Sequence, residues 1–345
     1  MPRKLLLGRL IIIASVILVL IAGGYLLLAA RPDAVYPVIQ PVEVSGGNYR
    51  DIELGFSFGG EPRAVTIPVN GTVYYGAQRA QKQAILSHEI PDEIFIPAYY
   101  LSFLEDPDLE EFYRELAGAF RGIREGSSLD DDEYLELMAA AVQSIPYETD
   151  GTLTAPKFPV ETYVDGKGDC DDKALLLAGL LAREGYSVAL FYFSPETHMA
   201  LGVKGYRCDY RGTGYGYIGA TNLSLVGVDP GPLAGGVELT SEPLVIPVAN
   251  GTRLYGRCLE TAAITGALER TDDRSASLSR ELEALSARMG DLRSRGKFAE
   301  YNQLLPQYDA LVKDYNGNVE VHNYILQHLD DRTGTYEYLQ TRALV

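Results

Sequence analysis

Apolar and polar positions along the chain change their spacing several times, and each spacing predicts a different kind of element. Residues 10–30 carry no charge. As a helix rising about 1.5 Å per residue, this run spans a hydrocarbon core of about 30 Å. Arg3, Lys4 and Arg9 precede it, so the positive-inside rule places residues 1–9 in the cytoplasm. We therefore expect a single-pass transmembrane helix, with the rest of the chain extracytoplasmic at the cell membrane.

A cleaved signal peptide is the alternative explanation of this run. Its apolar core would have only about 7–15 residues and would end at a site with small residues. Ala29 and Ala30 are small, but the uncharged run of 21 residues is longer than a signal peptide needs. We expect the helix to be retained as an anchor.

Period-two alternation and repeated turn residues predict strands after the anchor. Residues 36–73 form short apolar runs separated by Gly and Pro, with clear alternation at residues 64–67. The sequence of residues 67–72 returns in similar form at residues 246–252, and both copies predict a strand followed by an Asn-Gly turn. The copies are expected to pair or lie side by side, unless the repeat is a chance reuse of one turn.

The middle of the chain predicts an α+β core. Helical spacing predicts helices over residues 106–123 and 129–145, and residues 169–184 are apolar nearly all round, as in a buried helix. The continuous apolar run at residues 187–193 predicts a central strand. A second strand is expected to begin at His198, and a third to lie near residues 215–221.

The last part of the chain shows heptad spacing. Apolar residues from Leu278 to Leu292 alternate steps of four and three, and a second seam runs from Tyr301 to His322 in steps of seven. These seams predict a helical hairpin, of coiled-coil type, over residues 272–330. The hairpin either packs on its own domain or mediates self-association with a second chain.

The charge balance limits the partners. The 345 residues carry a formal net charge of −17. Because phosphate binding needs clustered Lys and Arg, this charge excludes nucleic acid and broad docking on anionic lipid. The expected partners are the membrane, through residues 10–30, and a protein or peptide outside the cell.

An odd number of cysteines in an exported chain leaves at least one free thiol. Cys208 and Cys258 are possible disulfide partners, although spacing alone fixes no connectivity, and Cys170 stands in a different setting. Possible glycosylation sites, in Asn-x-Ser/Thr triplets, are Asn70, Asn222 and Asn250.

Cys170 is the candidate nucleophile. It lies in the first turn of the helix predicted over residues 169–184, where the helix dipole is expected to lower the pKa of a thiol below about 8.5. His198 begins a strand that can face this turn, hold the thiolate as an ion pair and protonate a leaving amine. Taken alone, an inert Cys and a hydrogen-bonded structural His are the commoner explanation of such residues.

The residues around this pair resemble the core of the transglutaminase-like superfamily. The residues that match its pattern in order and spacing are Gly168, Cys170, Asp172, Ala174, Gly185 and His198. The resemblance is specific over residues 156–221, extends more loosely to residues 144–147, and is strongest to a membrane-anchored, largely archaeal prokaryotic group of unassigned function. It implies a papain-like fold: a helix bearing the Cys, packed on an antiparallel sheet. The domain would cover residues 34–265, with its core at residues 129–222.

The resemblance implies acyl transfer from an amide by a Cys-His-Asp triad, without a cofactor. Cys170 would be the nucleophile and His198 the general base and acid, while Gly168 and Asp172 would be structural. The third acid should precede a small-Thr pair, but Gly219 stands in that position. Asn222 is the candidate replacement, through a shift of register. Poorer candidates, in turns, are Asp209 and Asp229.

Two functions from different classes follow. One is a thiol enzyme that hydrolyses or transfers protein amide bonds. The other is a catalytically impaired member of the fold that serves as a cell-surface binding or scaffold module, which the missing acid and the hairpin favour. Zinc is a third idea, but structural zinc needs four ligands in closely spaced pairs, and the sequence has no such pairs. No metal is expected.

Overall fold

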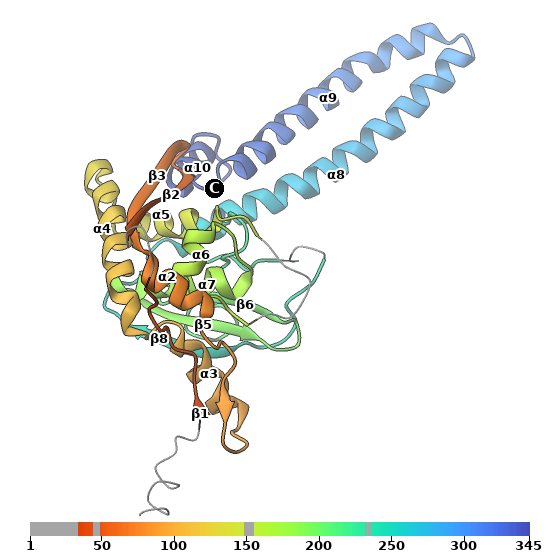
Figure 1. The fold of residues 1–345 in the computed structure, drawn as a ribbon. Helices are drawn as coiled ribbons and strands as arrows, with labels where there is room; N and C mark the ends of the chain where they lie inside the picture. Colours follow the sequence, from red (N-terminus) through yellow and green to blue (C-terminus); the bar gives the residue numbers. More distant parts are fainter. Residues whose placement is uncertain (1–33, 44–48, 148–154, 232, 234–235) are drawn as a thin grey trace, which may run out of the picture.

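The computed structural model describes residues 34–43, 49–147, 155–231, 233 and 236–345 (Figure 1). Residues 1–9 and the transmembrane helix expected at residues 10–30 lie outside this part of the chain. Among the described residues, no helix combines the length and the apolar character needed to cross a membrane. The chain folds as a mixed α+β structure, as the sequence predicts.

A four-stranded antiparallel sheet forms the centre of the molecule, in the order β7–β6–β5–β8. Its strands are β5 (Ser187–Phe193), β6 (His198–Val203), β7 (Gly216–Ile218) and β8 (Leu244–Asn250). The prediction of a central strand at residues 187–193 is confirmed, because β5 pairs on both sides and has both faces nearly buried. The predicted start of the next strand at His198 is also confirmed.

Helices cover one face of this sheet. They are α4 (Glu110–Ser127), α5 (Asp131–Gln143), α6 (Pro159–Asp165) and α7 (Cys170–Arg183). α7 packs against β5 and β6 on one side and against α4, α5 and α6 on the other, which explains why its apolar residues surround the whole helix. The other face of the sheet carries a second, smaller aromatic cluster that contains Phe191, Phe193 and Tyr217.

A long hairpin, β2 (Tyr49–Phe58) and β3 (Glu61–Asn70), packs over α4 and α5. Its turn, Gly59-Gly60, needs glycine because the φ angles are positive, +64° at Gly59 and +72° at Gly60. The expectation that the two copies of the sequence repeat pair is wrong: β3 pairs with β2, and β8 pairs with β5. In the first copy Asn70 does not turn a hairpin but caps α2 (Gly71–Arg79), since its side chain accepts from the Thr72 N–H.

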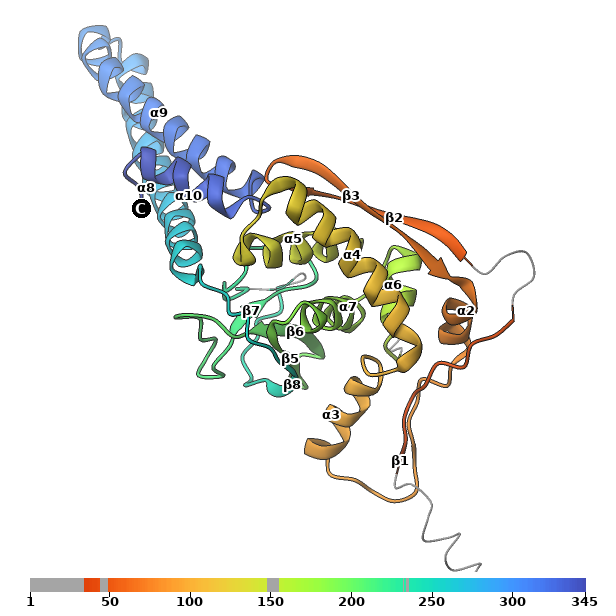
Figure 2. The same ribbon diagram turned by 90° about the vertical axis from the view of Figure 1, so that its left-hand side faces the viewer.

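Several short elements carried no clear signal in the sequence. They are β1 (Ala34–Val35), β4 (Ile85–Leu86), α3 (Asp92–Ser102), the 3₁₀ turn η1 (Pro107–Leu109) and α10 (Arg332–Thr341). β1 pairs with β4, and Figure 2 shows α3 beside them at the same end of the molecule.

Two long helices, α8 (Cys258–Ser294) and α9 (Phe298–Gln327), form an antiparallel hairpin that projects from the body (Figures 1 and 2). The apolar seam predicted along the first helix is largely buried, with Leu278 and Leu285 among its buried residues. Polar contacts hold the hairpin near its base, where Asn318 Nδ2 donates to the Thr271 carbonyl at 2.7 Å. The first helix begins 14 residues before the predicted start at residue 272, because it continues into the body.

Candidate active site

Cys170 is the first residue of α7, and a capping box fixes this helix end. The Asp169 carboxylate accepts from the Asp172 N–H at 3.2 Å, and the Asp172 carboxylate accepts from the Asp169 N–H at 3.2 Å. Asp172 also accepts from the Lys157 N–H at 2.6 Å. Such a cap contributes about 1 kcal/mol, so the role of Asp172 is structural, in keeping with the implication of the sequence.

Gly168 is required by close packing against this cap. A Cβ atom on Gly168 would lie 2.8 Å from the Asp172 Cβ and 3.1 Å from the Thr162 Cγ2. The Gly168 N–H also donates to the Pro146 carbonyl at 3.2 Å. The Gly-x-Cys-x-Asp spacing therefore sets the entry of the chain into α7.

The Cys170 thiol is buried, with 9% of the residue exposed. Burial raises the pKa of this thiol to about 12, the charge of Asp171 adds to the increase, and the N–H groups of Met199 and Asp171 oppose it. The expectation of a lowered pKa is therefore wrong for this structure. The helix dipole is present, but desolvation outweighs it, and the thiol keeps its proton at neutral pH.

His198 lies at the start of β6, directly before Met199, whose N–H faces the thiol. The imidazole is buried, and this burial lowers its pKa to about 4. The ring is therefore neutral at neutral pH. The two pKa shifts favour a neutral thiol and a neutral imidazole at neutral pH over the preformed ion pair that the sequence suggested.

The polar partner of His198 is Tyr217. The Tyr217 hydroxyl lies 3.4 Å from the His198 Nε2, and the nearby Cys170 contributes to raising the pKa of this phenol above its usual value, mainly an effect of burial. Leu201 pairs with Ile218 across β6 and β7. Side chains alternate between the two faces along a strand, so Tyr217 and Gly219, two residues apart, point to the same face. Tyr217 is therefore on the face where the missing acid would stand.

The structure does not bring Asn222 to His198. Asn222 is exposed in the bend after β7, and the hydrogen bond that His198 makes among the described residues is with Tyr217. The bulge that would have presented Asn222 is absent from the described β6–β7 pairing. Asp209 and Asp229 lie in irregular segments, where they accept from the N–H groups of Gly214 and Gly231.

Two tyrosines complete the surroundings of the thiol. The Tyr147 hydroxyl interacts with the Cys170 thiol, and burial raises the pKa of this phenol to about 12. Tyr147 is 47% exposed, so this residue forms the solvent side of the site. Tyr100 of α3 lies against Tyr192 of β5, with ring centroids 5.6 Å apart. Both Tyr147 and Tyr100 hold their protons at neutral pH and can donate to a carbonyl oxygen.

Lys173, one turn after Cys170, is fully buried and holds the segment after β7. Its ammonium donates to the carbonyl oxygens of Gln143 at 3.1 Å, Ile145 at 2.6 Å and Thr221 at 2.8 Å. Two of these carbonyls belong to the C-terminal end of α5, where the helix dipole favours a cation. Lys173 thus connects α5, α7 and the segment beside His198.

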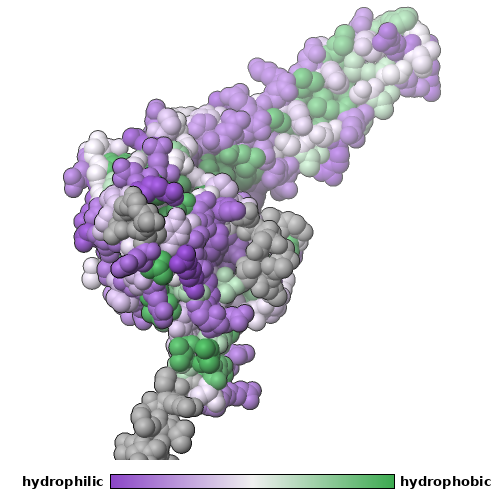
Figure 3. All heavy atoms as spheres, viewed as in Figure 1, coloured by the Kyte–Doolittle hydropathy of each residue, from purple (hydrophilic) through white to green (hydrophobic). Residues whose placement is uncertain are grey.

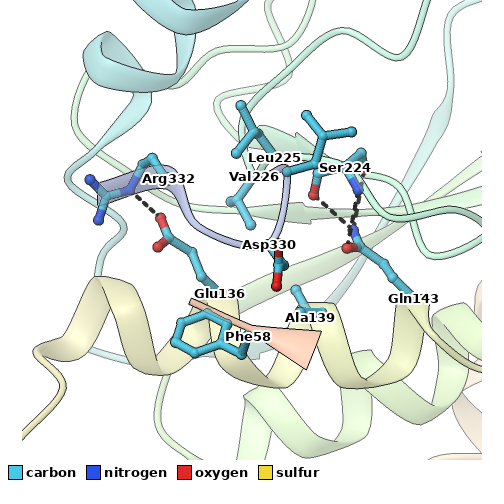
Figure 4. Close-up of a pocket in the computed structure, with 11 residues that line it drawn as sticks. Phe58, Glu136, Ala139, Gln143, Ser224, Leu225, Val226, Asp330 and Arg332 are labelled. Carbon is cyan, nitrogen blue, oxygen red and sulfur yellow. Dashed lines mark hydrogen bonds and ion pairs between the residues drawn. The ribbon is translucent and has the colours of Figure 1, made fainter. Parts of the chain in front are cut away.

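Gln143 provides a second connection to this segment. Its Nε2 donates to the Gly219 carbonyl at 2.7 Å. The same Nε2 donates to the Ser224 carbonyl at 3.2 Å, and Figure 4 shows Gln143 beside Ser224. Figure 4 also shows the pair of Glu136 and Arg332 across a small pocket between α5 and the base of the helical hairpin. Cys170 and His198 do not line this pocket, so it is separate from the candidate site.

Residues of metal-ligating type come together near the thiol, but without forming the zinc set considered above. Among the described residues, the close group consists of Asp169, Asp171 and Asp172. Asp169 and Asp172 form the helix cap, and Asp171 hydrogen-bonds to Asp169 while burial raises its pKa well above the usual range. A shared proton and the cap account for this cluster.

Cys208 and Cys258 form a disulfide, and Cys170 is the free cysteine. The bridge joins the segment after β6 to the first residue of α8. Of the three Asn-x-Ser/Thr sites, Asn222 and Asn250 are exposed, whereas Asn70 is half-buried as a helix cap.

Comparison with family models, with curated proteins and with solved structures gave no match for this chain.

Proposed function

We propose that this chain is a membrane-anchored, extracytoplasmic, transglutaminase-like thiol enzyme that hydrolyses or transfers protein amide bonds. One observation carries the proposal: Cys170 begins a buried helix beside the first residues of β6, where His198 has the Tyr217 hydroxyl at 3.4 Å as its polar partner. A nucleophile, a base and a group that orients the base are the parts that covalent catalysis on an amide requires. The papain-like description of the fold rests on the resemblance and on a Cys-bearing helix packed on an antiparallel sheet.

The two neutral groups favour general-base catalysis. As the Cys170 sulfur forms a bond with the amide carbonyl carbon, its proton passes to His198. The imidazolium then gives this proton to the leaving nitrogen as the C–N bond breaks, which leaves a thioester on Cys170. Attack by water or by an amine, with His198 again taking and returning the proton, releases the acid or the new amide and restores the thiol.

Tyr217 is proposed as a positioning residue and Tyr147 as a hydrogen-bond donor to the developing oxyanion. Tyr217 holds the Nε2 side of the ring, which leaves the Nδ1 side to exchange a proton with the sulfur. Tyr147 interacts with the thiol from the solvent side, where a substrate carbonyl would enter.

The cell-surface location is supported by two independent features. The uncharged run of residues 10–30 has the length of a membrane span. The Cys208–Cys258 disulfide is typical of an oxidising compartment.

Alkylation of Cys170 by iodoacetamide tests the proposed pair, because the other two cysteines are bridged. The labelling rate of the detergent-solubilised full chain would be followed by mass spectrometry at neutral pH. Loss of the base in His198→Ala should slow labelling by about 10²-fold. Loss of one hydrogen bond in Tyr217→Phe, about 1 kcal/mol, should slow it about 5-fold.

Gly219 gives a matched pair of variants for the same assay. A Cβ here would meet only ordinary contacts, 3.4 Å from the Ser224 Oγ and 3.6 Å from the Tyr217 Cε1. Gly219→Asp should place a carboxylate on the face that carries Tyr217, make His198 more basic and speed labelling, whereas Gly219→Ala should leave the rate unchanged.

The second candidate function is a binding or scaffold module of the same fold. Gly219 in place of the acid and the burial of both Cys170 and His198 favour it. A labelling rate that follows only the thiolate fraction of an ordinary buried thiol, unchanged in His198→Ala, would reject the enzyme and leave this module as the function.

A further inference from the structure

The rest of the described chain covers the apolar helix α3 only in part. Its sequence, DEIFIPAYYLS, is mostly apolar, yet none of its 11 residues is buried. An apolar helix normally lies in a protein core or in a membrane. Four of its apolar residues, Ile96, Tyr99, Tyr100 and Leu101, are half-buried against the core. Ile94, on the uncovered side, is 62% exposed, so part of α3 lacks an apolar partner in the described part of the chain.

The neighbouring strands extend this apolar surface. We define the basal patch as five aliphatic side chains, each between 41% and 62% exposed: Val35, Val38, Ile85, Leu86 and Ile94. Figure 3 shows hydrophobic side chains gathered at the end of the molecule that carries α3 and β1, below a largely hydrophilic body. Contiguous exposed apolar patches of this kind mark interaction sites.

Internal contacts make the basal patch one surface. Tyr36, next to β1, stacks on Phe95 of α3 with ring centroids 6.2 Å apart. The Tyr99 hydroxyl of α3 donates to the Lys82 carbonyl, close to β4, at 2.9 Å. The patch therefore belongs to a fixed arrangement of α3, β1 and β4.

The position of the basal patch along the chain identifies its partner. The uncharged run ends at Ala30 and β1 begins at Ala34. Four residue steps span at most about 14 Å, and the headgroup zone of a bilayer is about 5–7 Å thick on each side. If residues 10–30 cross the bilayer, as proposed above, β1 must lie at or just above its surface.

We propose that the basal patch docks into the outer surface of the lipid bilayer that anchors the chain. The inserted elements are the apolar side chains of β1, β4 and α3, and this inference rests on the proposed membrane anchor. A groove of about 340 Å³ beside the patch is lined in part by Arg79. Arg79 is exposed and has no ion-pair partner among the described residues, so its guanidinium can meet a lipid phosphate.

The charges nearby specify the lipid. Asp92 and Glu93 are exposed in the first turn of α3, and the whole chain carries a net charge of −17. Anionic headgroups would repel these groups. Docking is therefore driven by apolar burial and is expected on zwitterionic phosphatidylcholine, where it should change little with salt.

Docking at α3 also places the candidate active site. Tyr100 of the same helix lies against Tyr192, and Cys170 lies close enough to raise the pKa of the Tyr100 phenol, which burial raises most. The thiol is thereby held near the membrane surface. The helical hairpin of α8 and α9 points away from the basal patch (Figure 1). The substrates that this arrangement favours are membrane-proximal segments of surface proteins.

The absence of Trp from the chain gives a direct test. The full chain would be reconstituted in phosphatidylcholine vesicles with a single reporter, Ile94→Trp, and Trp emission compared with and without lipid brominated in its acyl chains. Phe298→Trp, on the exposed first residue of α9, is the matched control. Ile85→Trp is a second reporter on a different element.

Both basal reporters should emit to the blue of Phe298→Trp and be quenched at least about twofold more strongly, because interfacial side chains reach about 5–10 Å into the bilayer. Vesicle flotation in the same samples tests the anchor separately. A chain that floats while the basal reporters stay unquenched would overturn docking alone. A blue-shifted but unquenched reporter would show that protein, such as a second copy, covers the patch. A chain that neither floats nor is quenched would overturn both proposals.

Discussion

Burial sets the protonation of individual residues in this molecule more than any single charge does. Cys170, His198 and Lys173 each hold less charge at neutral pH, or hold it less tightly, than the free side chain does, and desolvation is the first cause in all three. For Cys170 and His198 the result is a neutral pair, which in the proposed mechanism would react by proton transfer during attack. Lys173 differs because three carbonyl oxygens surround its ammonium.

Lys173 gives a prediction at the residue scale. Replacing it in Lys173→Met leaves three carbonyls without their donor and should lower the free energy of unfolding at pH 7 by about 1–3 kcal/mol. Burial lowers the Lys173 pKa from 10.5 to about 8. Between pH 8 and pH 10.5 the unfolded chain therefore binds more protons than the folded chain. The stability of the unmodified chain should therefore gain with pH above 8, relative to the variant.

Chemical denaturation at pH 7 and pH 9.5 in detergent measures this difference. The exposed Lys313→Met of α9 is the control and should match the unmodified chain at both values. A gap between the unmodified chain and Lys173→Met that narrows as pH rises would contradict the assigned pKa shift.

At the scale of elements, a buried guanidinium helps to attach α10 to the body. Arg332 is 3% exposed and pairs with Glu136 of α5 at 2.5 Å and with Glu260 of α8. Glu136 also accepts from the Tyr255 hydroxyl. Arg332 therefore connects the base of the helical hairpin to the helix that carries Gln143 at its end.

Arg332→Gln should destabilise the chain by about 3–5 kcal/mol, because it leaves the buried Glu136 carboxylate without its cation in a desolvated place, while Glu260 keeps its pair with Arg257. The matched control is Arg342→Gln, whose pair with Glu320 is exposed and should contribute less than about 1 kcal/mol. Unfolding curves of both variants test this, and equal effects of the two would show that burial adds nothing to the Arg332 pairs.

At the scale of the whole molecule, the disulfide joins the hairpin to the sheet. Cys208 and Cys258 are 50 residues apart, and glycines crowd the bridge: a Cβ on Gly205 would lie 2.6 Å from the Cys208 Sγ, and one on Gly227 would lie 2.6 Å from the Cys258 Sγ. The body therefore closes tightly around this bridge, at the start of a helix of 37 residues that extends about 55 Å.

Removing the bridge in the double variant Cys208→Ala/Cys258→Ala should cost about 4 kcal/mol in the chain-entropy model for a loop of this length. Hydrogen exchange should increase first in the segment after β6 and in the first turns of α8. Cys170→Ala, which leaves the bridge intact, is the control. Faster exchange confined to the far end of the hairpin would contradict the assignment of the bridge to its base.

Much of the local structure followed from the sequence. The apolar run of β5, the start of β6 at His198 and the buried helix α7 depend on side-chain period and on capping residues close in the chain, so the pattern predicts them. The candidate nucleophile and its histidine were found in the same way. The short elements β1, β4 and α3 were missed because tertiary contacts, and not period, hold them in place.

What only the tertiary structure decided is which groups far apart in the chain share one buried space. The position of Tyr217 beside His198 depends on the register of β6 and β7. The three carbonyl oxygens that accept from Lys173 come together because of how α5 ends against α7. The direction of the Cys170 pKa shift depends on how much water the packed chain removes, which no local pattern records. The sequence by itself determined the elements and the candidate pair, and long-range packing determined their protonation, their partners and the uncovered face of α3.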